Sequence, residues 1–210
     1  LGDVYKRQVH AGFGSIHLGI VPSLRLRGLE SPSGELDWHA LPEDSLRQTL
    51  ALLLSLPLDV HWEPIRSYQL RALRKLAINA CINPTTALVD CKNGDLFGTP
   101  AALELFRALC TEMSQVLEAY ARDAKAAESS NETDAAHLSS LPLADLLTQT
   151  DSEGLPLLDA SLKPASLLHE VENVVRATAS NWSSMHQDVK TRRGKTEIDF
   201  INGYIKELDR

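Results

Sequence analysis

The sequence has few cysteines and no residues at the spacing of a metal site. Its three cysteines, Cys81, Cys91 and Cys110, are odd in number and lie in or near apolar periodic segments. A disulfide framework needs paired cysteines, so we expect reduced thiols in an intracellular protein. The seven histidines are scattered, and no cysteine pair has a histidine at metal-ligand spacing. We therefore expect no metal ion.

Excess positive charge and long apolar runs are also missing. The 21 lysine and arginine residues are outnumbered by 28 acidic residues, which gives a formal net charge of −7. This balance argues against nucleic acid as a partner. The longest apolar run, near residues 50–54, is too short to cross a bilayer, so we expect no membrane partner. The remaining composition, 43% hydrophobic and 23% charged, is typical of a globular protein with a buried core.

The first 65 residues carry the patterns of an α/β domain. Glycines among β-forming residues at 9–19 predict a short hairpin or two edge strands. A helix is expected to open near Pro42 and to end at about Leu56, before a strand over 58–62. Gly12 and Gly14 do not complete the G-x-G-x-x-G pattern of a dinucleotide loop. We interpret residues 1–65 as the tail of an α/β domain, and residues 1–8, which match none of these patterns, as candidates for a foreign extension.

Residues 66–210 have the periodicity of a mainly α domain. Helices are expected from about Arg66, from Pro100, from Pro164 and after Thr196. Pro84 predicts a break or kink in the first of these helices. The segment 123–163 is rich in small and polar residues and predicts a flexible insertion. The expected apolar stripes are formed by Leu70, Leu73, Ala77 and Ala80; by Leu103, Phe106, Leu109 or Cys110, Met113, Val116 or Leu117, and Tyr120; by Leu168, Val171, Val175, Thr178 and Trp182; and by Ile198, Ile201, Ile205 and Leu208.

Lys75, Asn79 and Asn83 recur at intervals of four residues in the first of these helices. This spacing sets them along one side of a helix, away from its apolar stripe. Asparagine is a poor residue for a helix interior, and an exposed face more often carries glutamate, lysine, arginine or glutamine. Short amides beside one lysine suit a cleft, where they can bind the oxygens of a ligand. From spacing alone, a ligand site and a solvated polar face both stay open.

A second set of polar residues, Asn181, Ser183, Ser184 and Glu197, lies downstream. Two serines and an asparagine are also typical of a fraying helix end. A glutamate in the first turn of a helix is typical of a residue that compensates the helix dipole. Taken alone, the pattern favours these structural interpretations.

Three segments together resemble a known family. They are "KLAINACINPTTAL" with the "NG" that follows it, "NWSSMHQDV" and "TEIDFINGYI". In this order they resemble the C-terminal half of ketopantoate reductase, over residues 9–122 and 164–210. That family, also called 2-dehydropantoate 2-reductase, joins an N-terminal Rossmann domain to an all-helical domain. The resemblance implies that residues 1–65 are the tail of the NADP-binding domain and that 66–210 are the helical C-terminal domain.

The resemblance also implies an activity, the NADPH-dependent reduction of 2-dehydropantoate to (R)-pantoate in pantothenate and coenzyme A biosynthesis. An ammonium near the substrate carbonyl can stabilise the charge that develops on its oxygen and then deliver a proton. The expected partner is a small 2-keto acid, in the cytoplasm or in mitochondria, and a homodimer is compatible with the family. The resemblance places the catalytic lysine at Lys75 and substrate-binding residues at Asn79, Asn83, Asn93, Asn181, Ser184 and Glu197.

The sequence departs from the family pattern in several places. Leu73 stands where tryptophan is frequent, and the interval from Asp188 to Glu197 is one residue longer than expected. The insertion at 123–163 is longer than in compact bacterial members and suggests a fungal-type relative. The dinucleotide loop and the family's last helices are absent from the sequence, so we expect a fragment, truncated at both ends and inactive on its own. A reductase of another 2-keto acid and a helical interaction module without catalysis stay open as alternatives.

Overall fold

The structure is a computed structural model that describes residues 14–20, 34–42, 45–129, 146–152 and 156–209. The chain forms two compact units, Leu1–Tyr68 and Gln69–Arg210. The boundary between them falls within a helix, α2 (Ile65–Val89). Among the described residues, no helix is long and apolar enough to cross a membrane.

The first unit contains strands β1 (Ile16–Leu18) and β2 (Val60–Trp62), with helix α1 (Ser45–Leu54) between them in sequence. The strands run parallel, with Ile16 opposite Val60 and Leu18 opposite Trp62. Parallel strands need a crossover connection, and α1 lies in it. The helix and strand expected over 42–56 and 58–62 are thereby confirmed. Part of the segment 9–19, expected as a hairpin or two edge strands, forms strand β1, which pairs with β2; residues 9–13 lie outside the described residues, so the hairpin itself is not tested.

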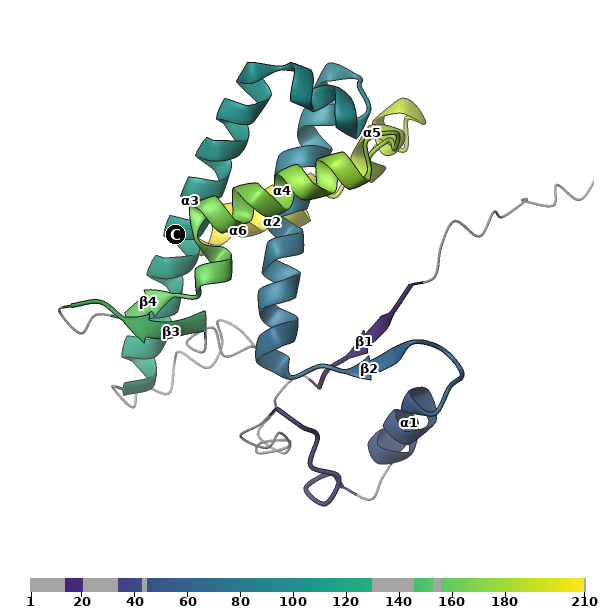
Figure 1. Ribbon diagram of the computed structural model, residues 1–210, viewed down its shortest axis with the longest axis vertical. Coiled ribbons are helices and arrows are strands. Elements are labelled where there is room, and N and C mark those ends of the chain that lie inside the picture. Colours follow the sequence, from purple (N-terminus) through teal and green to yellow (C-terminus); the bar gives the residue numbers. More distant parts are fainter. Residues whose placement is uncertain (1–13, 21–33, 43–44, 130–145, 153–155, 210) are drawn as a thin grey trace, which may run out of the picture. The chain divides into compact units, whose positions relative to one another are not determined.

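Helices α2, α3 (Pro100–Ser129), α4 (Pro164–Ala177) and α6 (Ile198–Leu208) build the core of the second unit. Figure 1 shows α4 running from the β3–β4 hairpin, which lies beside α3, to α5 (Ser184–Lys190) at its other end. The mainly α fold class expected from the sequence is confirmed. The predicted apolar stripes supply the core, whose most buried members include Leu73, Ala77, Ala80, Phe106, Cys110, Leu117, Val171, Val175, Ile201 and Ile205.

The two ends of the segment 123–163 are packed, whereas the polar stretch on which the prediction of flexibility mainly rests lies outside the described residues, so that prediction is not tested there. α3 continues to Ser129, and β3 (Leu147–Thr150) and β4 (Pro156–Leu158) form an antiparallel hairpin. Leu146, Leu158 and Leu162, the last in the short helix η4 (Ala160–Leu162), are buried in the core. These leucines fix the C-terminal end of the segment, and the domain expected to be all-helical contains a small sheet. Residues 130–145 and 153–155 lie outside the described residues.

The three cysteines are free thiols. Cys81 on α2 and Cys110 on α3 are fully buried, with their Sγ atoms 4.0 Å apart. The hydrogen bond with Cys110 and burial raise the pKa of the Cys81 thiol. This pair therefore serves as small core side chains where α2 and α3 meet.

Helix α2 continues through Pro84, where the sequence predicts a break or kink. Proline lacks an N–H, so the carbonyl four residues earlier, that of Ala80, loses its helical donor. Asn202 on α6 replaces that donor: its Nδ2 donates to Ala80 O at 3.3 Å. A side chain from a distant helix thus compensates the proline. The periodicity of the sequence could not reveal this contact.

Asn202→Ala is expected to lower the free energy of unfolding by about 1–3 kcal/mol, because it leaves the Ala80 carbonyl without a donor. With Pro84→Ala, the backbone N–H at position 84 can donate to that carbonyl, so Asn202→Ala should then cost less. Urea unfolding of the four members of this double-mutant cycle measures the coupling. An equal cost of Asn202→Ala in both backgrounds would contradict the compensation.

Candidate functional site

Helix α2 carries the predicted row of polar residues along one side. Because α2 is unbroken, Lys75, Asn79 and Asn83 lie about one turn apart. Lys75 is exposed, Asn79 is half-buried and Asn83 is buried. Lys75 has no ion-pair partner among the described residues. The lysine end of the row is therefore open, and the asparagine end is enclosed.

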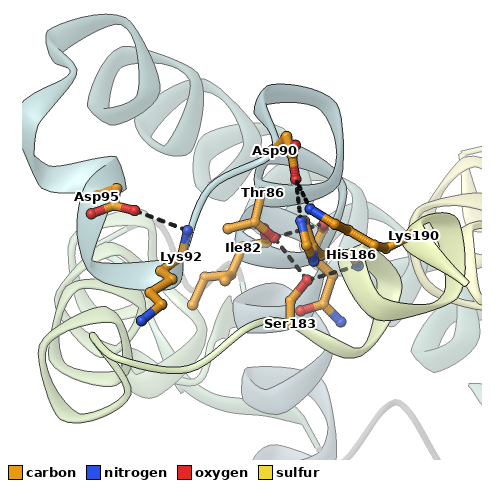
Figure 2. A network of polar contacts seen from close by, with 9 residues as sticks. Ile82, Thr86, Asp90, Lys92, Asp95, Ser183, His186 and Lys190 are labelled. Carbon is orange, nitrogen blue, oxygen red and sulfur yellow. Dashed lines mark hydrogen bonds and ion pairs between the residues drawn. The ribbon is translucent and has the colours of Figure 1, made fainter.

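Two hydrogen bonds join the enclosed end of the row to the start of α5. Asn83 Nδ2 donates to Ser184 Oγ at 3.5 Å. Thr86 Oγ1 donates to Ser183 Oγ at 2.8 Å, as Figure 2 shows. Ser183 is also the N-cap of α5, since its Oγ accepts from His186 N at 3.1 Å. Two sequence motifs that are 101 residues apart thus meet at one place.

Asp90 follows α2 directly and forms a third link to α5 (Figure 2). Its left-handed backbone, with φ of 49°, is typical of a residue that ends a helix. Asp90 Oδ1 accepts from His186 Nε2 at 2.6 Å and from Lys190 Nζ at 3.3 Å. The hydrogen bond from His186, followed by that from Lys190 and its charge, lowers the pKa of the Asp90 carboxyl. The ring of His186 also stacks on the ring of Trp182, with the two ring centroids 4.2 Å apart.

The Asn93-Gly94 pair holds the segment between α4 and α5. It opens the short helix η1 (Asn93–Gly98). Asn93 N donates to Asn181 O, and Gly94 N donates to Ala179 O, both at 3.0 Å. The Asn93 side chain is buried, and its Nδ2 donates to Thr178 Oγ1 at 2.9 Å. These contacts turn the Asn93 amide towards the protein, where it fixes the segment that carries Asn181.

The structure links four of the predicted site residues by direct contacts, Asn83 to Ser184 and Asn93 to Asn181. Asn181 and Ser184 are exposed, so their side chains are accessible to a ligand. Lys75 and Asn79 share α2 with Asn83, and among the described residues no side-chain hydrogen bond joins either of them to these four residues. Glu197 is also separate: it is exposed at the start of α6, and its carboxylate makes no capping hydrogen bond.

Two local predictions for this region are corrected. The helix that starts at Pro164 ends at Ala177 rather than near Trp182. Ser183 is then the N-cap of a separate helix, α5, so the serines are not a fraying end. Glu197 is the N-cap of α6 and not a residue of its first turn.

Sequence reasoning missed Thr86, Asp90 and His186. Thr86 and Asp90 continue the row beyond Asn83 at steps of three and four residues, and that spacing was a usable signal. The expected break at Pro84 concealed it. Nothing in the sequence indicates that His186 reaches Asp90, which lies 96 residues away.

The chain matches the family model described as "Ketopantoate reductase PanE/ApbA C terminal" over residues 67–210. It belongs to this ketopantoate reductase family. The resemblance seen in the three sequence motifs is thereby confirmed. The matched range includes all seven site residues predicted from the sequence of this chain.

Relatives of known name agree with the family match. The chain is 30% identical to the 2-dehydropantoate 2-reductase of Yersinia pestis over 197 residues, which cover 94% of this chain and 45% of that protein. It is 28% identical to the "probable 2-dehydropantoate 2-reductase" of Schizosaccharomyces pombe over 204 residues, with coverage of 95% and 47%. It is 35% identical to the Vibrio cholerae enzyme of the same name over 146 residues, with coverage of 70% and 35%. The chain thus spans less than half the length of these curated relatives.

Proposed function

We propose that this chain is the substrate-binding part of an NADPH-dependent 2-dehydropantoate 2-reductase. The reaction is the reduction of 2-dehydropantoate to (R)-pantoate in pantothenate and coenzyme A biosynthesis. One observation carries the proposal: an open lysine, Lys75, stands at the end of a row of amides that leads to the Asn83–Ser184 contact. The choice of 2-dehydropantoate as the substrate follows from the names of the relatives.

Lys75 is proposed as the general acid. NADPH, when bound, supplies the hydride that reduces the C2 carbonyl. Negative charge develops on the carbonyl oxygen, and an ammonium beside it stabilises that charge and then gives up a proton. The exposure of Lys75 and its lack of an ion-pair partner among the described residues leave its ammonium available for this role.

The amides and the serine are proposed to hold the keto acid. Ser184, Asn181 and Asn79 are neutral donors that can bind the substrate carboxylate, and Asn83 orients the Ser184 hydroxyl. Asn93 is proposed to contribute to substrate binding indirectly, by fixing the segment that carries Asn181. Neutral donors can bind an anion here without neutralising the charge of Lys75.

Glu197 is proposed to accept a hydrogen bond from the substrate hydroxyl. Its exposed carboxylate at the start of α6 has no capping bond that competes for it. A site that hydrogen-bonds a substrate hydroxyl discriminates against analogues without one, because the site's own polar group is then left unpaired.

The described residues fit the keto acid and do not fit the dinucleotide. A pyrophosphate binds where a glycine-rich loop leads into a helix N-terminus. The described part of the chain contains no such glycine-rich loop. We therefore assign NADPH to no residue of this chain.

Glu197→Ala in the full-length protein tests the proposal. Loss of a hydrogen bond to a charged group should raise KM for 2-dehydropantoate by about 10- to 100-fold. Discrimination against 3,3-dimethyl-2-oxobutanoate, which lacks the hydroxyl, should shrink in proportion. Steady-state kinetics with both acids measures this change in selectivity.

Glu207→Ala, which alters an exposed glutamate of α6, is the matched control and should leave both values unchanged. Unchanged selectivity in Glu197→Ala would mean that the extra residue before "TEID" has moved the carboxylate away from the substrate. A wild-type protein that prefers another 2-keto acid, or reduces none, would contradict the proposed function itself.

A further inference from the structure

The contacts that hold the start of α5 on α2 differ in strength. The Asn83–Ser184 bond is 3.5 Å long, at the limit of hydrogen bonding, and joins two neutral groups. The His186–Asp90 bond is 2.6 Å long and ends on a carboxylate. Hydrogen bonds to ionised groups are shorter and about twice as strong as neutral ones. Ser184 is therefore poorly held by its own contact and depends on its neighbours in α5.

His186 is fixed in the fold around its contact with Asp90. Its side chain is buried, with the residue 5% exposed, and one face of its ring is covered by Trp182. Its backbone N–H donates a hydrogen bond to Ser183 Oγ. A carboxylate can only accept, so Nε2 carries the proton that is donated to Asp90. The other ring nitrogen, Nδ1, is buried without a hydrogen-bond partner among the described residues. The Nε2–H tautomer is thus the form that this pocket accommodates.

We propose that His186 and Asp90 are positioning residues for the substrate carboxylate. Their bond, together with the Thr86–Ser183 bond, fixes α5 on the end of α2, and α5 begins with Ser184, two residues before His186. Neither residue is placed at the substrate: His186 is buried, and Asp90 lies beyond the C-terminal end of α2, whereas Lys75 lies on the opposite side of Asn83. This inference rests on the proposed function and adds a determinant of substrate affinity to it.

Lys190 contributes less to this link than His186 does. Its Nζ lies 3.3 Å from Asp90 Oδ1, and its side chain is 61% exposed. Exposed ion pairs of this kind stabilise a fold little. The positioning effect is therefore assigned to the histidine.

Variants at position 90 in the full-length protein test this inference. Asp90→Ala removes the acceptor and should raise KM for 2-dehydropantoate by about 3- to 10-fold. This is less than the effect of losing a charged hydrogen bond to the substrate itself, because the broken bond acts on substrate binding only through Ser184. KM for NADPH should not change, and kcat should change less than KM. Asp90→Asn keeps an acceptor for the Nε2 proton and should restore KM to within about threefold of the wild-type value.

His186→Phe isolates the hydrogen bond from the stacking. Phenylalanine keeps an aromatic ring against Trp182 but has no N–H to donate to Asp90. The rise in KM for 2-dehydropantoate in His186→Phe should therefore match that in Asp90→Ala. Because both variants break the same bond, the double variant should be no worse than either single one. Additive effects would show that the two residues act separately and would overturn the inference.

Two matched controls exclude general effects of charge. Lys190→Ala keeps the histidine bond and should leave KM within about twofold of the wild-type value. Glu172→Ala removes an exposed ion pair with Arg176 within α4 that makes no contact with Asp90 or His186, and it should behave like the wild type. A rise of KM in Lys190→Ala equal to that in Asp90→Ala would assign the effect to the ion pair instead.

A measurement independent of activity separates this inference from the proposed function. Nitrogen-15 NMR of the histidines in the wild-type protein should show His186 as the Nε2–H tautomer, and Asp90→Ala should give a mixture of tautomers. A wild-type protein that does not reduce 2-dehydropantoate would defeat the proposed function, even with the tautomer as expected. An active enzyme in which Asp90→Ala shifts the tautomer but leaves KM unchanged would defeat the positioning role alone.

Discussion

Lys75→Ala in the full-length protein is expected to lower kcat by about 10²- to 10⁴-fold, with little change in KM for NADPH. The ammonium acts on charge that exists mainly in the transition state, so its loss should appear in the chemical step rather than in binding. The magnitude is that of general acid catalysis. Because Lys75 is exposed and forms no ion pair among the described residues, the substitution should change the free energy of unfolding by no more than about 0.5 kcal/mol.

Two further variants separate the roles of this lysine. Lys75→Arg keeps a positive charge but gives up a proton far less readily, so its kcat should lie between those of the wild type and Lys75→Ala. Lys206→Ala, an exposed lysine in the last turn of α6, is the matched control and should have normal kinetics. A Lys75→Ala enzyme with near-normal kcat would remove Lys75 from the role of general acid.

Local spacing was enough to predict which side of a helix each residue occupies. The apolar positions Leu73, Ala77 and Ala80 face the core, as their three- and four-residue steps predict. The same rule places Lys75 and Asn79 on another side of α2. These predictions succeed because they depend only on helix geometry, which neighbouring residues determine.

Contacts between distant segments could not be predicted in this way. Asn202 donates to a carbonyl of α2 that is 122 residues away, and this contact replaces the donor that Pro84 removes. The His186–Asp90 bond joins residues 96 positions apart. Periodicity tells which face a residue occupies, but not which partner that face will meet. The substrate-binding part of the proposed site is built mainly from contacts of this second kind.

Gly94 shows how closely two such distant segments approach. Its N–H donates to Ala179 O at 3.0 Å, beside the Asn93–Asn181 bond. A Cβ at position 94 would lie 2.6 Å from Ala179 Cβ and 2.9 Å from both its Cα and its carbonyl oxygen. Two of these three atoms belong to the backbone, so a rotamer change cannot relieve the contact. The segment that carries Asn181 would have to move away from η1.

Gly94→Ala is therefore expected to lower the free energy of unfolding by about 1–3 kcal/mol, the usual cost of overpacking. For a unit of this size the melting temperature should fall by about 4–10 °C. In the full-length protein, KM for 2-dehydropantoate should rise by about tenfold, because the displaced segment leads through Asn181 to Ser184. Differential scanning calorimetry and steady-state kinetics measure the two effects.

Gly98→Ala provides the matched control for this prediction. Gly98 ends the same short helix, and a Cβ at its position would meet nothing within 4 Å. Its φ is also outside the positive range that favours glycine. Gly98→Ala should therefore have nearly the wild-type melting temperature and KM. If the two alanine variants behaved alike, the close approach to Ala179 would not be what requires glycine at position 94, and the segment carrying Asn181 would tolerate displacement without loss of substrate binding.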